Sequence, residues 1–141
     1  MEFTHAFYDA LPPEAAAIRQ AVFVEEQGFQ EEFDAIDRHA LHLLLFADGE
    51  PVGTLRAFTE DGGTRWHIGR VAVIQSARQL HLGRRMMDLA EAELRRRGAA
   101  GIEVSAQCRV QPFYEKCGFT SVGEVYLDEF CPHIRMVKEL E

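Results

Sequence analysis

The sequence predicts one domain of mixed α and β structure, either α+β or mixed α/β. Its 141 residues are enough for one hydrophobic core and one site. Apolar residues recur with a helical period in some segments and form short strand-like runs in others. No linker, internal repeat or low-complexity tract separates these segments. We therefore expect residues 1–141 to form a single layered domain.

The first third of the chain predicts two helices. The proline pair in Leu11–Glu14 suits the first turn of a helix, because proline fixes φ at a helical value. Apolar residues then recur at helical spacing to about Gln27, and Gly28 ends the helix. These apolar residues are Ala15, Ile18 and Val22. A short second helix is expected over residues 31–38.

An antiparallel meander is expected next. His42–Ala47 is a buried strand, and Asp48–Pro51 carries the turn residues that end it. Val52–Phe58 forms the partner strand, and Glu60–Gly63 makes the next turn. Arg65–Val73 is a long third strand. Three strands joined by such short turns pair as neighbours.

The second half predicts two more helices and three more strands. Gly83–Arg97 is a helix with an apolar stripe, formed by Met86, Met87, Ala90 and Leu94. Gly101–Gln107 is a β-branched strand and Val110–Lys116 is a short helix. Strands are expected at Phe119–Leu127 and Pro132–Lys138. The predicted order is α, α, β, β, β, α, β, α, β, β.

Charge and hydropathy exclude several classes of protein. The net charge is -8, and residues 1–37 hold nine acids against Arg19 alone. So acidic a chain is a poor general binder of nucleic acid, which needs a broad cationic face. No apolar run approaches the roughly 20 residues that a bilayer requires, and the acidic start is not a signal peptide. We expect a soluble, cytoplasmic protein with no membrane partner.

The acidic segment and the cysteines each allow two interpretations. Residues 1–37 can attract a cationic substrate, or can simply present a solvated charged helix face. The three cysteines include no C-x-x-C pair, so we interpret them as free thiols rather than as a disulfide framework or a zinc site. They are Cys108, Cys117 and Cys131. His39 and His42 lack a third ligand, so no metal is expected.

The join between the strand at Arg65–Val73 and the helix at Gly83 is suited to an anion. The first turn of a helix offers free backbone N–H groups and the positive end of its dipole. Arg78, Arg84 and Arg85 add formal charge, so a pyrophosphate would suit the site. The alternative is a plain strand-to-helix connection with solvated arginines. The P-loop pattern is absent.

A second sequence pattern, in residues 106–119, resembles a known protein family when it is taken together with the first. In residues 106–119 a strand end precedes a short helix with Phe113-Tyr114, followed by Gly118-Phe119. Together with the V-x-V strand and the Arg78-to-Gly83 loop, this order resembles the GNAT superfamily of acetyl-CoA-dependent N-acetyltransferases. Residues 19–27, with 124–126 and 132–136, resemble its ElaA-like branch.

The resemblance implies a central, mostly antiparallel twisted sheet whose middle strands splay apart, flanked by about four helices. It implies direct transfer from acetyl-CoA to a small-molecule or peptide amine in a ternary complex, with a possible homodimer. Backbone groups of Val71 and Val73 would bind pantetheine. The other residues implied to contact the coenzyme are Arg78, Gln79, Leu80, His81, Leu82, Gly83, Arg84 and Phe113. His81 stands where the family loop has a glycine, so its side chain either weakens coenzyme binding or acts as a donor.

Acid and base candidates follow from the same resemblance. Tyr114 matches the tyrosine placed near the sulfur and is expected to be the general acid, although it can also be a packed aromatic residue. His67 is the first candidate for the base. The alternatives are Glu25 or Glu26, which can also bind a cationic acceptor, and His133. Arg70 and Gln107 are expected to orient the acceptor. The rival hypothesis is a non-catalytic acyl-CoA-binding module.

Overall fold

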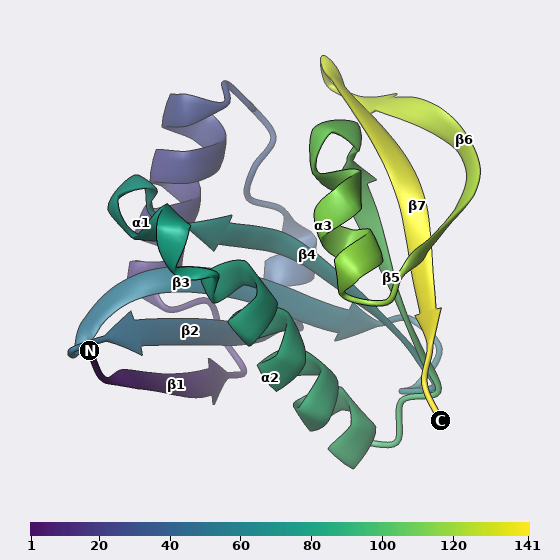
Figure 1. Cartoon of the computed structure of the whole chain (residues 1–141), viewed down its shortest axis with the longest axis horizontal. Helices are drawn as coiled ribbons and strands as arrows, with labels where there is room; N and C mark the ends of the chain where they lie inside the picture. The colour runs from purple at the N-terminus through teal and green to yellow at the C-terminus, as the bar shows by residue number, and fades with distance from the viewer.

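The computed structural model describes residues 1–141 and arranges seven strands in one sheet, in the order β1-β2-β3-β4-β5-β7-β6 (Figure 1). The strands are β1 (Phe3–Tyr8), β2 (Leu41–Ala47), β3 (Glu50–Thr59), β4 (Arg65–Val73), β5 (Gly101–Gln107), β6 (Thr120–Asp128) and β7 (Cys131–Glu139). The α-helices are α1 (Pro13–Arg19), α2 (Leu82–Arg96) and α3 (Gln111–Lys116). A π-helix, η1 (Gln20–Glu26), and three 3₁₀ turns, η2 (Ala35–Arg38), η3 (Gln75–Leu80) and η4 (Cys108–Val110), complete the chain.

The predicted fold class is confirmed. Every neighbouring pair of strands is antiparallel except β4 and β5, which run parallel. The predicted meander is β2, β3 and β4, and the two closing strands form the hairpin of β6 and β7. No helix combines the length and apolar character needed to cross a bilayer.

The strand β1 is absent from the predicted order. It pairs antiparallel with β2 at the edge of the sheet, from Phe3 opposite Ala47 to Tyr8 opposite His42. Its burial does not alternate along the strand, and no residue in it is fully buried. A half-exposed edge strand therefore carried too weak a period-two signal to be predicted.

The first helical region begins and ends as predicted, but its interior differs. α1 passes into the π-helix η1, and Gly28 then takes a positive φ of 82° that ends the helix. The second helix expected over residues 31–38 is reduced to η2. Its first residues cannot join a helix because their backbone groups are used elsewhere: the Glu32 carbonyl accepts from Arg19 and Arg70.

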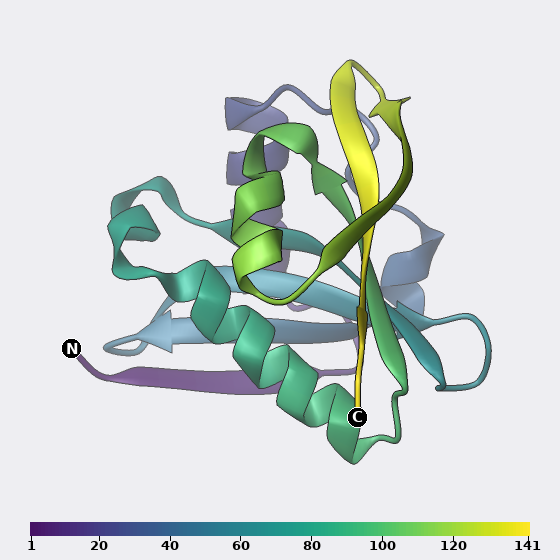
Figure 2. The same cartoon turned by 45° about the vertical axis from the view of Figure 1, so that its right-hand side comes forward.

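The middle strands splay apart, as the resemblance implied. β4 and β5 pair only from Arg65–Ile68 against Gly101–Val104. Beyond Ile68, β4 follows β3, and β5 follows β7 over its whole length. Arg70 has a positive φ of 52° at a bulge in the β3–β4 pairing, which turns the end of β4. The two strand ends therefore form a wedge, visible from both directions in Figures 1 and 2.

Helices cover both faces of the sheet around this wedge. α2 lies across β2, β3 and β4 on one face, and α1 packs on the same strands from the other (Figure 2). The predicted apolar stripe of α2 is confirmed, because Met86, Met87, Ala90 and Leu94 are all buried. α3 packs against β5, and its Tyr114 belongs to the same core cluster as α2. The open end of the wedge thus lies among η1, the start of α2 and α3.

Candidate functional site

Two cavities meet where β4 and β5 separate. The first, here called the large cleft, has a volume of about 1010 Å³ and lies among β4, the start of α2, and α3. The second, here called the small cavity, has about 300 Å³ and lies among the loop at residues 29–32, β4, β5 and the β6–β7 turn. Five residues line both: Gln27, Val71, Arg109, Val110 and Tyr114. Groups bound in the two cavities would come together at these residues.

Most of the residues expected to bind the coenzyme line the large cleft. These are Val71, Val73, Arg78, His81, Leu82, Gly83, Arg84 and Phe113. Gln79 and Leu80 belong to η3 and lie outside its lining. Because α2 begins at Leu82, the free N–H groups of its first turn lie at this cleft. The expected anion site is therefore built from a long helix end and two arginines.

His81 has a left-handed backbone conformation, which glycine adopts more readily than other residues. Its φ of 56° and ψ of 34° are left-handed, and it forms the link between η3 and α2. This conformation is strained for a residue with a Cβ. Gly83 leaves room for the Phe113 ring, since a Cβ there would lie 3.2 Å from it and the ring would have to shift slightly.

Glu26 lines the large cleft and not the small cavity. Its carboxylate accepts two hydrogen bonds from Arg78, at 2.7 and 2.8 Å, and Arg78 also donates to the Val73 carbonyl at 3.0 Å. These bonds to Arg78 lower the pKa of Glu26. Glu25 lines neither cavity. The two acids proposed as base or acceptor ligand are therefore not gathered at one point.

Tyr114 is buried and lies between the two cavities. Its side chain is 8% exposed, and its ring packs edge-on against Phe113 and Phe119. Burial, with the neighbouring Cys117, raises the pKa of Tyr114 well above its ordinary value, so the phenol keeps its proton at neutral pH. No protein group hydrogen-bonds its hydroxyl, which is therefore free to act on a bound group.

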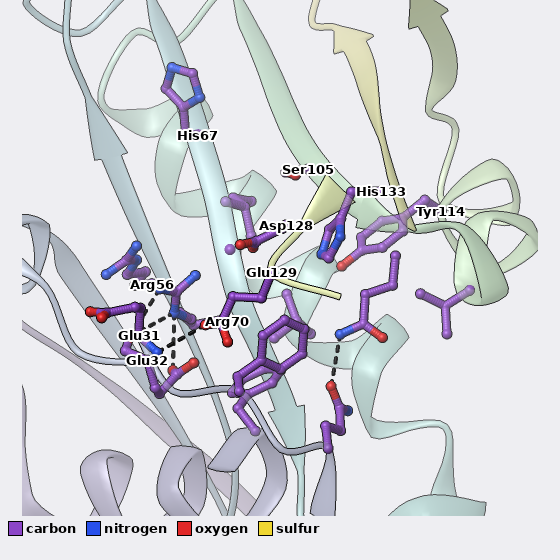
Figure 3. Close-up of a pocket in the computed structure, with 18 of the residues that line it drawn as sticks. Glu31, Glu32, Arg56, His67, Arg70, Ser105, Tyr114, Asp128, Glu129 and His133 are labelled. Atoms are coloured by element: carbon purple, nitrogen blue, oxygen red, sulfur yellow. Dashed lines mark hydrogen bonds and ion pairs between the residues drawn. The ribbon is translucent and has the colours of Figure 1, made fainter. Parts of the chain in front are cut away.

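His67 lines the small cavity at the end where β4 and β5 are still paired. Its ring stacks on Phe58 with centroids 4.8 Å apart. Its Nε2 lies 3.4 Å from Glu60, and its Nδ1 lies 3.6 Å from Glu103. Figure 3 shows His67 away from the group formed by Tyr114 and His133.

His133 lies on β7, beside Tyr114 in the small cavity (Figure 3). It is 6% exposed, and its Nδ1 lies 2.9 Å from the Cys131 carbonyl oxygen. The ring stacks on Tyr126 and meets Phe29 edge-on. Its orientation is thus fixed by packing and by one hydrogen bond.

Arg70 and Gln107 also line the small cavity. Arg70 is engaged with the protein, since it donates to the Glu32 carbonyl at 3.0 and 3.1 Å and pairs with the Glu32 carboxylate at 3.0 Å. Gln107 donates to the Gln27 Oε1 at 2.8 Å and accepts from Arg109 at 2.9 Å. This amide bridge joins η1 to β5 across the splayed strands.

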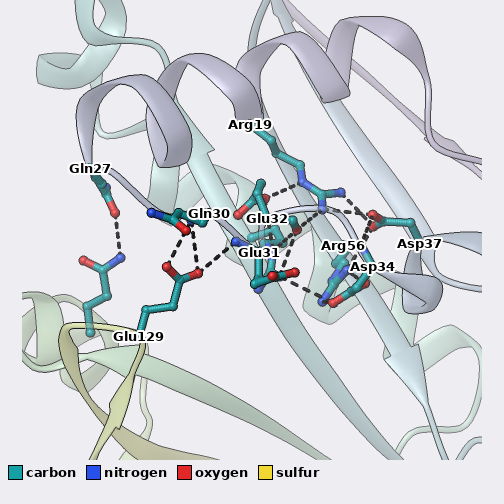
Figure 4. Close-up of polar contacts among 11 residues, drawn as sticks. Arg19, Gln27, Gln30, Glu31, Glu32, Asp34, Asp37, Arg56 and Glu129 are labelled. Carbon is teal, nitrogen blue, oxygen red and sulfur yellow. Dashed lines mark hydrogen bonds and ion pairs between the residues drawn. The ribbon is translucent and has the colours of Figure 1, made fainter.

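A buried ionic network holds the loop that forms one wall of the small cavity (Figure 4). Arg19 is 1% exposed and bonds Glu32 and Asp37, while Arg56 bonds Asp34 and Asp37. Burial alone would raise the pKa of Asp37, but the two guanidinium groups lower it to about 2. Burial raises the pKa of Glu32 despite its arginine partners. The only sequence signal was an arginine on the apolar face of a predicted helix.

The β6–β7 turn closes the small cavity from above. Glu129 accepts hydrogen bonds from the backbone N–H groups of Gln30 and Glu31, at 2.9 to 3.1 Å (Figure 4). The ring of Phe130 stacks on Phe29 with centroids 5.1 Å apart. The hydrogen bonds of Glu129 join residues almost 100 positions apart, and no local sequence pattern indicated them. No three His, Cys, Asp or Glu side chains are grouped to hold a metal ion.

Comparisons with known proteins agree with this geometry. The family described as "Acetyltransferase (GNAT) domain" matches residues 9–140. The Bacillus subtilis protein named uncharacterized N-acetyltransferase YjcF is 32% identical, over 89% of this chain and 91% of its own. The crystal structure of Escherichia coli ElaA aligns with a TM-score of 0.85 at 28% identity, covering 98% of this chain and 99% of that one. An acyl-CoA N-acyltransferase from Pseudomonas aeruginosa aligns with a TM-score of 0.82 at 30% identity, covering 97% and 98%.

Proposed function

The chain belongs to the GNAT acetyltransferase family, and we propose that it transfers the acetyl group of acetyl-CoA directly to the amine of a small molecule or peptide while both substrates are bound. One observation carries the proposal: the large cleft and the small cavity share Tyr114 and Val71. A thioester in the cleft and an amine in the cavity would be held together there, so proximity supplies much of the catalysis. No covalent enzyme intermediate is needed.

The residues of the large cleft suit coenzyme A. Its pyrophosphate would accept hydrogen bonds from the N–H groups at the start of α2 and would be attracted by the charges of Arg78 and Arg84. Beyond Ile68 the side of β4 that faces β5 has no strand partner, so its backbone can hydrogen-bond the pantetheine arm at Val71 and Val73. Bound there, the coenzyme supplies the activated acyl group.

Tyr114 would act as the general acid. Its raised pKa keeps the phenol protonated, and its hydroxyl is free to donate to the departing sulfur.

The acceptor would be an amine that carries a further positive charge. Glu31 and Asp128 line the small cavity, and neither side chain is in an ion pair. Arg109 is the one cavity arginine that pairs with no carboxylate, and it donates to Gln107. The uncompensated charge of the cavity is therefore negative on balance, which favours a cationic ligand.

Calorimetric titration with acetyl-CoA and with free CoA tests the coenzyme assignment. Saturable one-to-one binding is expected, and no binding at millimolar ligand would contradict it. A thiol-release screen with putrescine, lysine amide and tyramine then separates the enzyme from a non-catalytic acyl-CoA-binding module. Turnover is the expected result, and binding without turnover across a broad amine screen would select the binding module.

A further inference from the structure

We propose that His133 is the general base that takes a proton from the acceptor amine, an inference that rests on the proposed acetyl transfer. His133 lies on β7 opposite Gln107, at the end of β5, and lines the small cavity beside Tyr114 (Figure 3). Tyr114 also lines the large cleft, where the thioester would lie. An amine between the two side chains would therefore have a base on one side and the acid on the other.

The hydrogen bond of His133 fixes which ring nitrogen is basic. Nδ1 lies 2.9 Å from the Cys131 carbonyl oxygen, and a carbonyl oxygen can only accept. Nδ1 therefore carries the hydrogen in the neutral ring, and Nε2 holds a lone pair. The same carbonyl stabilises the imidazolium that forms when Nε2 takes a proton.

The Nε2 atom of His133, a residue that lines the small cavity, is open. Although His133 is 6% exposed, its Nε2 has no protein partner. Arg56 Nε is the only side-chain nitrogen or oxygen that is both fully buried and without a hydrogen-bond partner. Because His133 Nε2 also has no partner, it is not sealed from solvent. The ring is held by Tyr126, with centroids 6.1 Å apart, and by Phe29 at 6.3 Å. A fixed ring with one free lone pair is the geometry that a base requires.

The other candidates are engaged elsewhere. His67 faces Glu60 with one nitrogen and Glu103 with the other. Glu26 is held by Arg78 in the large cleft, on the coenzyme side. Neither offers a free basic atom beside Tyr114.

The carboxylates of the small cavity are less suitable than the imidazole. Glu32 is bound by Arg19 and Arg70, and Glu129 accepts three hydrogen bonds from backbone N–H groups. Glu31 and Asp128 are free but exposed, and a carboxylate is a weaker base than imidazole. They can attract the cation without deprotonating it.

The proton steps balance with these residues. An N–H bond of the substrate ammonium breaks as an Nε2–H bond forms on His133, and the freed nitrogen lone pair attacks the thioester carbon. The C–S bond breaks as the Tyr114 hydroxyl gives its proton to the sulfur. The protonated amide nitrogen then returns one proton to the Tyr114 oxygen, and His133 releases its proton to solvent. The products are the N-acetyl amine, CoA thiol and one proton.

The test compares His133→Asn with His5→Asn, a control at an exposed histidine of β1 that lines neither cavity. The asparagine amide introduced in place of the His133 ring can still donate to the Cys131 carbonyl, but it has no basic atom at the Nε2 position. Two acceptors are used: putrescine, an alkylammonium at pH 7, and methoxyamine, which is already neutral. For His133→Asn we expect kcat/KM with putrescine to fall about a hundredfold or more. With methoxyamine the fall should be far smaller, and His5→Asn should change neither rate substantially. The acetyl-CoA Kd should not change in either variant.

Two further measurements keep the result decisive. Nitrogen NMR of the wild-type protein should show that the neutral ring of His133 carries its hydrogen on Nδ1 and none on Nε2. The pH profile of kcat/KM with putrescine should lose its acidic limb in His133→Asn. The titratable or charged groups that line the cavity around His133 are Tyr114 on α3, Arg109 on η4, and Asp128 and Glu129 at the β6–β7 turn. Tyr126 of β6 and Cys131 lie beside the ring. The substitution at His133 alters none of these groups.

Each outcome supports or overturns the assignment. An Nε2–H tautomer, an unchanged rate with putrescine, or an equal loss with both acceptors would overturn the base role while leaving acetyl transfer intact. A wild-type protein that binds acetyl-CoA but releases no thiol with any amine would overturn the proposed function, and the base role with it.

Discussion

Replacing Arg19 with methionine should destabilise the fold more than any exposed arginine substitution. The Arg19 guanidinium is 1% exposed and makes four hydrogen bonds, to the carboxylates of Glu32 and Asp37 and to the Glu32 carbonyl. Methionine keeps the length of the side chain but leaves Glu32, 4% exposed, with the Arg70 partner alone. Removing one partner of a buried pair costs about 3–5 kcal/mol, and we expect the lower end because Arg56 and Arg70 remain.

Urea unfolding followed by Trp66 fluorescence measures this loss. Trp66 is the single tryptophan and is 9% exposed, so it reports on the core. The matched control is Arg95→Met, which removes an exposed Arg95–Glu91 pair at 3.3 Å and should cost less than about 0.5 kcal/mol. Equal losses for the two variants would refute the view that the network holds the cavity wall.

The same network predicts a dependence on pH. The pKa of Asp37 is lowered from 3.8 to about 2 in the folded protein, so its contribution is present above about pH 4. It is lost as the pH falls through about 2, and it amounts to at most about 2.5 kcal/mol. In Asp37→Asn this part of the acid-induced loss should disappear, and an unchanged profile between pH 4 and 2 would contradict the assignment.

Three further substitutions test the cleft and the cavity. His81→Gly should raise the free energy of unfolding by up to about 1 kcal/mol, because glycine removes the strain at φ 56°; a thermal or urea titration that shows a loss would contradict this. Glu26→Gln should lower the acetyl-CoA Kd a few-fold, since Arg78 is released for the pyrophosphate, and weaker binding by calorimetry would show that the pair supports the site. Asp128→Asn should raise the KM of putrescine a few-fold while leaving that of tyramine unchanged, and equal effects on both amines would show that Asp128 senses no second charge.

Much of the fold was predictable because local pattern and tertiary role agree. In β2 the residues are nearly all buried, so a continuous apolar run identified the strand. In α2 the buried residues follow the helical period without interruption. β1 was missed because an edge strand buries little, and the helix expected at residues 31–38 was shortened because its backbone bonds distant arginines.

The candidate site also has parts that could be predicted from the sequence and parts that could not. Tyr114 and the loop from Arg78 to Gly83 lie within two contiguous motifs that the sequence singled out, and residues of both line the large cleft. The lining of the small cavity comes from segments far apart in the sequence, among them the loop at residues 29–32, the strands β3, β4, β5 and β7, and the β6–β7 turn. Glu129 and the Gln27–Gln107 bridge join these segments. Such long-range contacts leave no periodic signal, and so the free Nε2 of His133 emerged only from the structure.

The most direct test of acetyl transfer at the junction of the two cavities is the rate of thiol release by Tyr114→Phe, measured beside its acetyl-CoA Kd. Phenylalanine keeps the ring that packs against Phe113 and Phe119 but has no proton to give. We predict that kcat falls by at least about a hundredfold with an unchanged Kd. A variant that binds acetyl-CoA and retains the wild-type rate would contradict the assignment of Tyr114 as the acid.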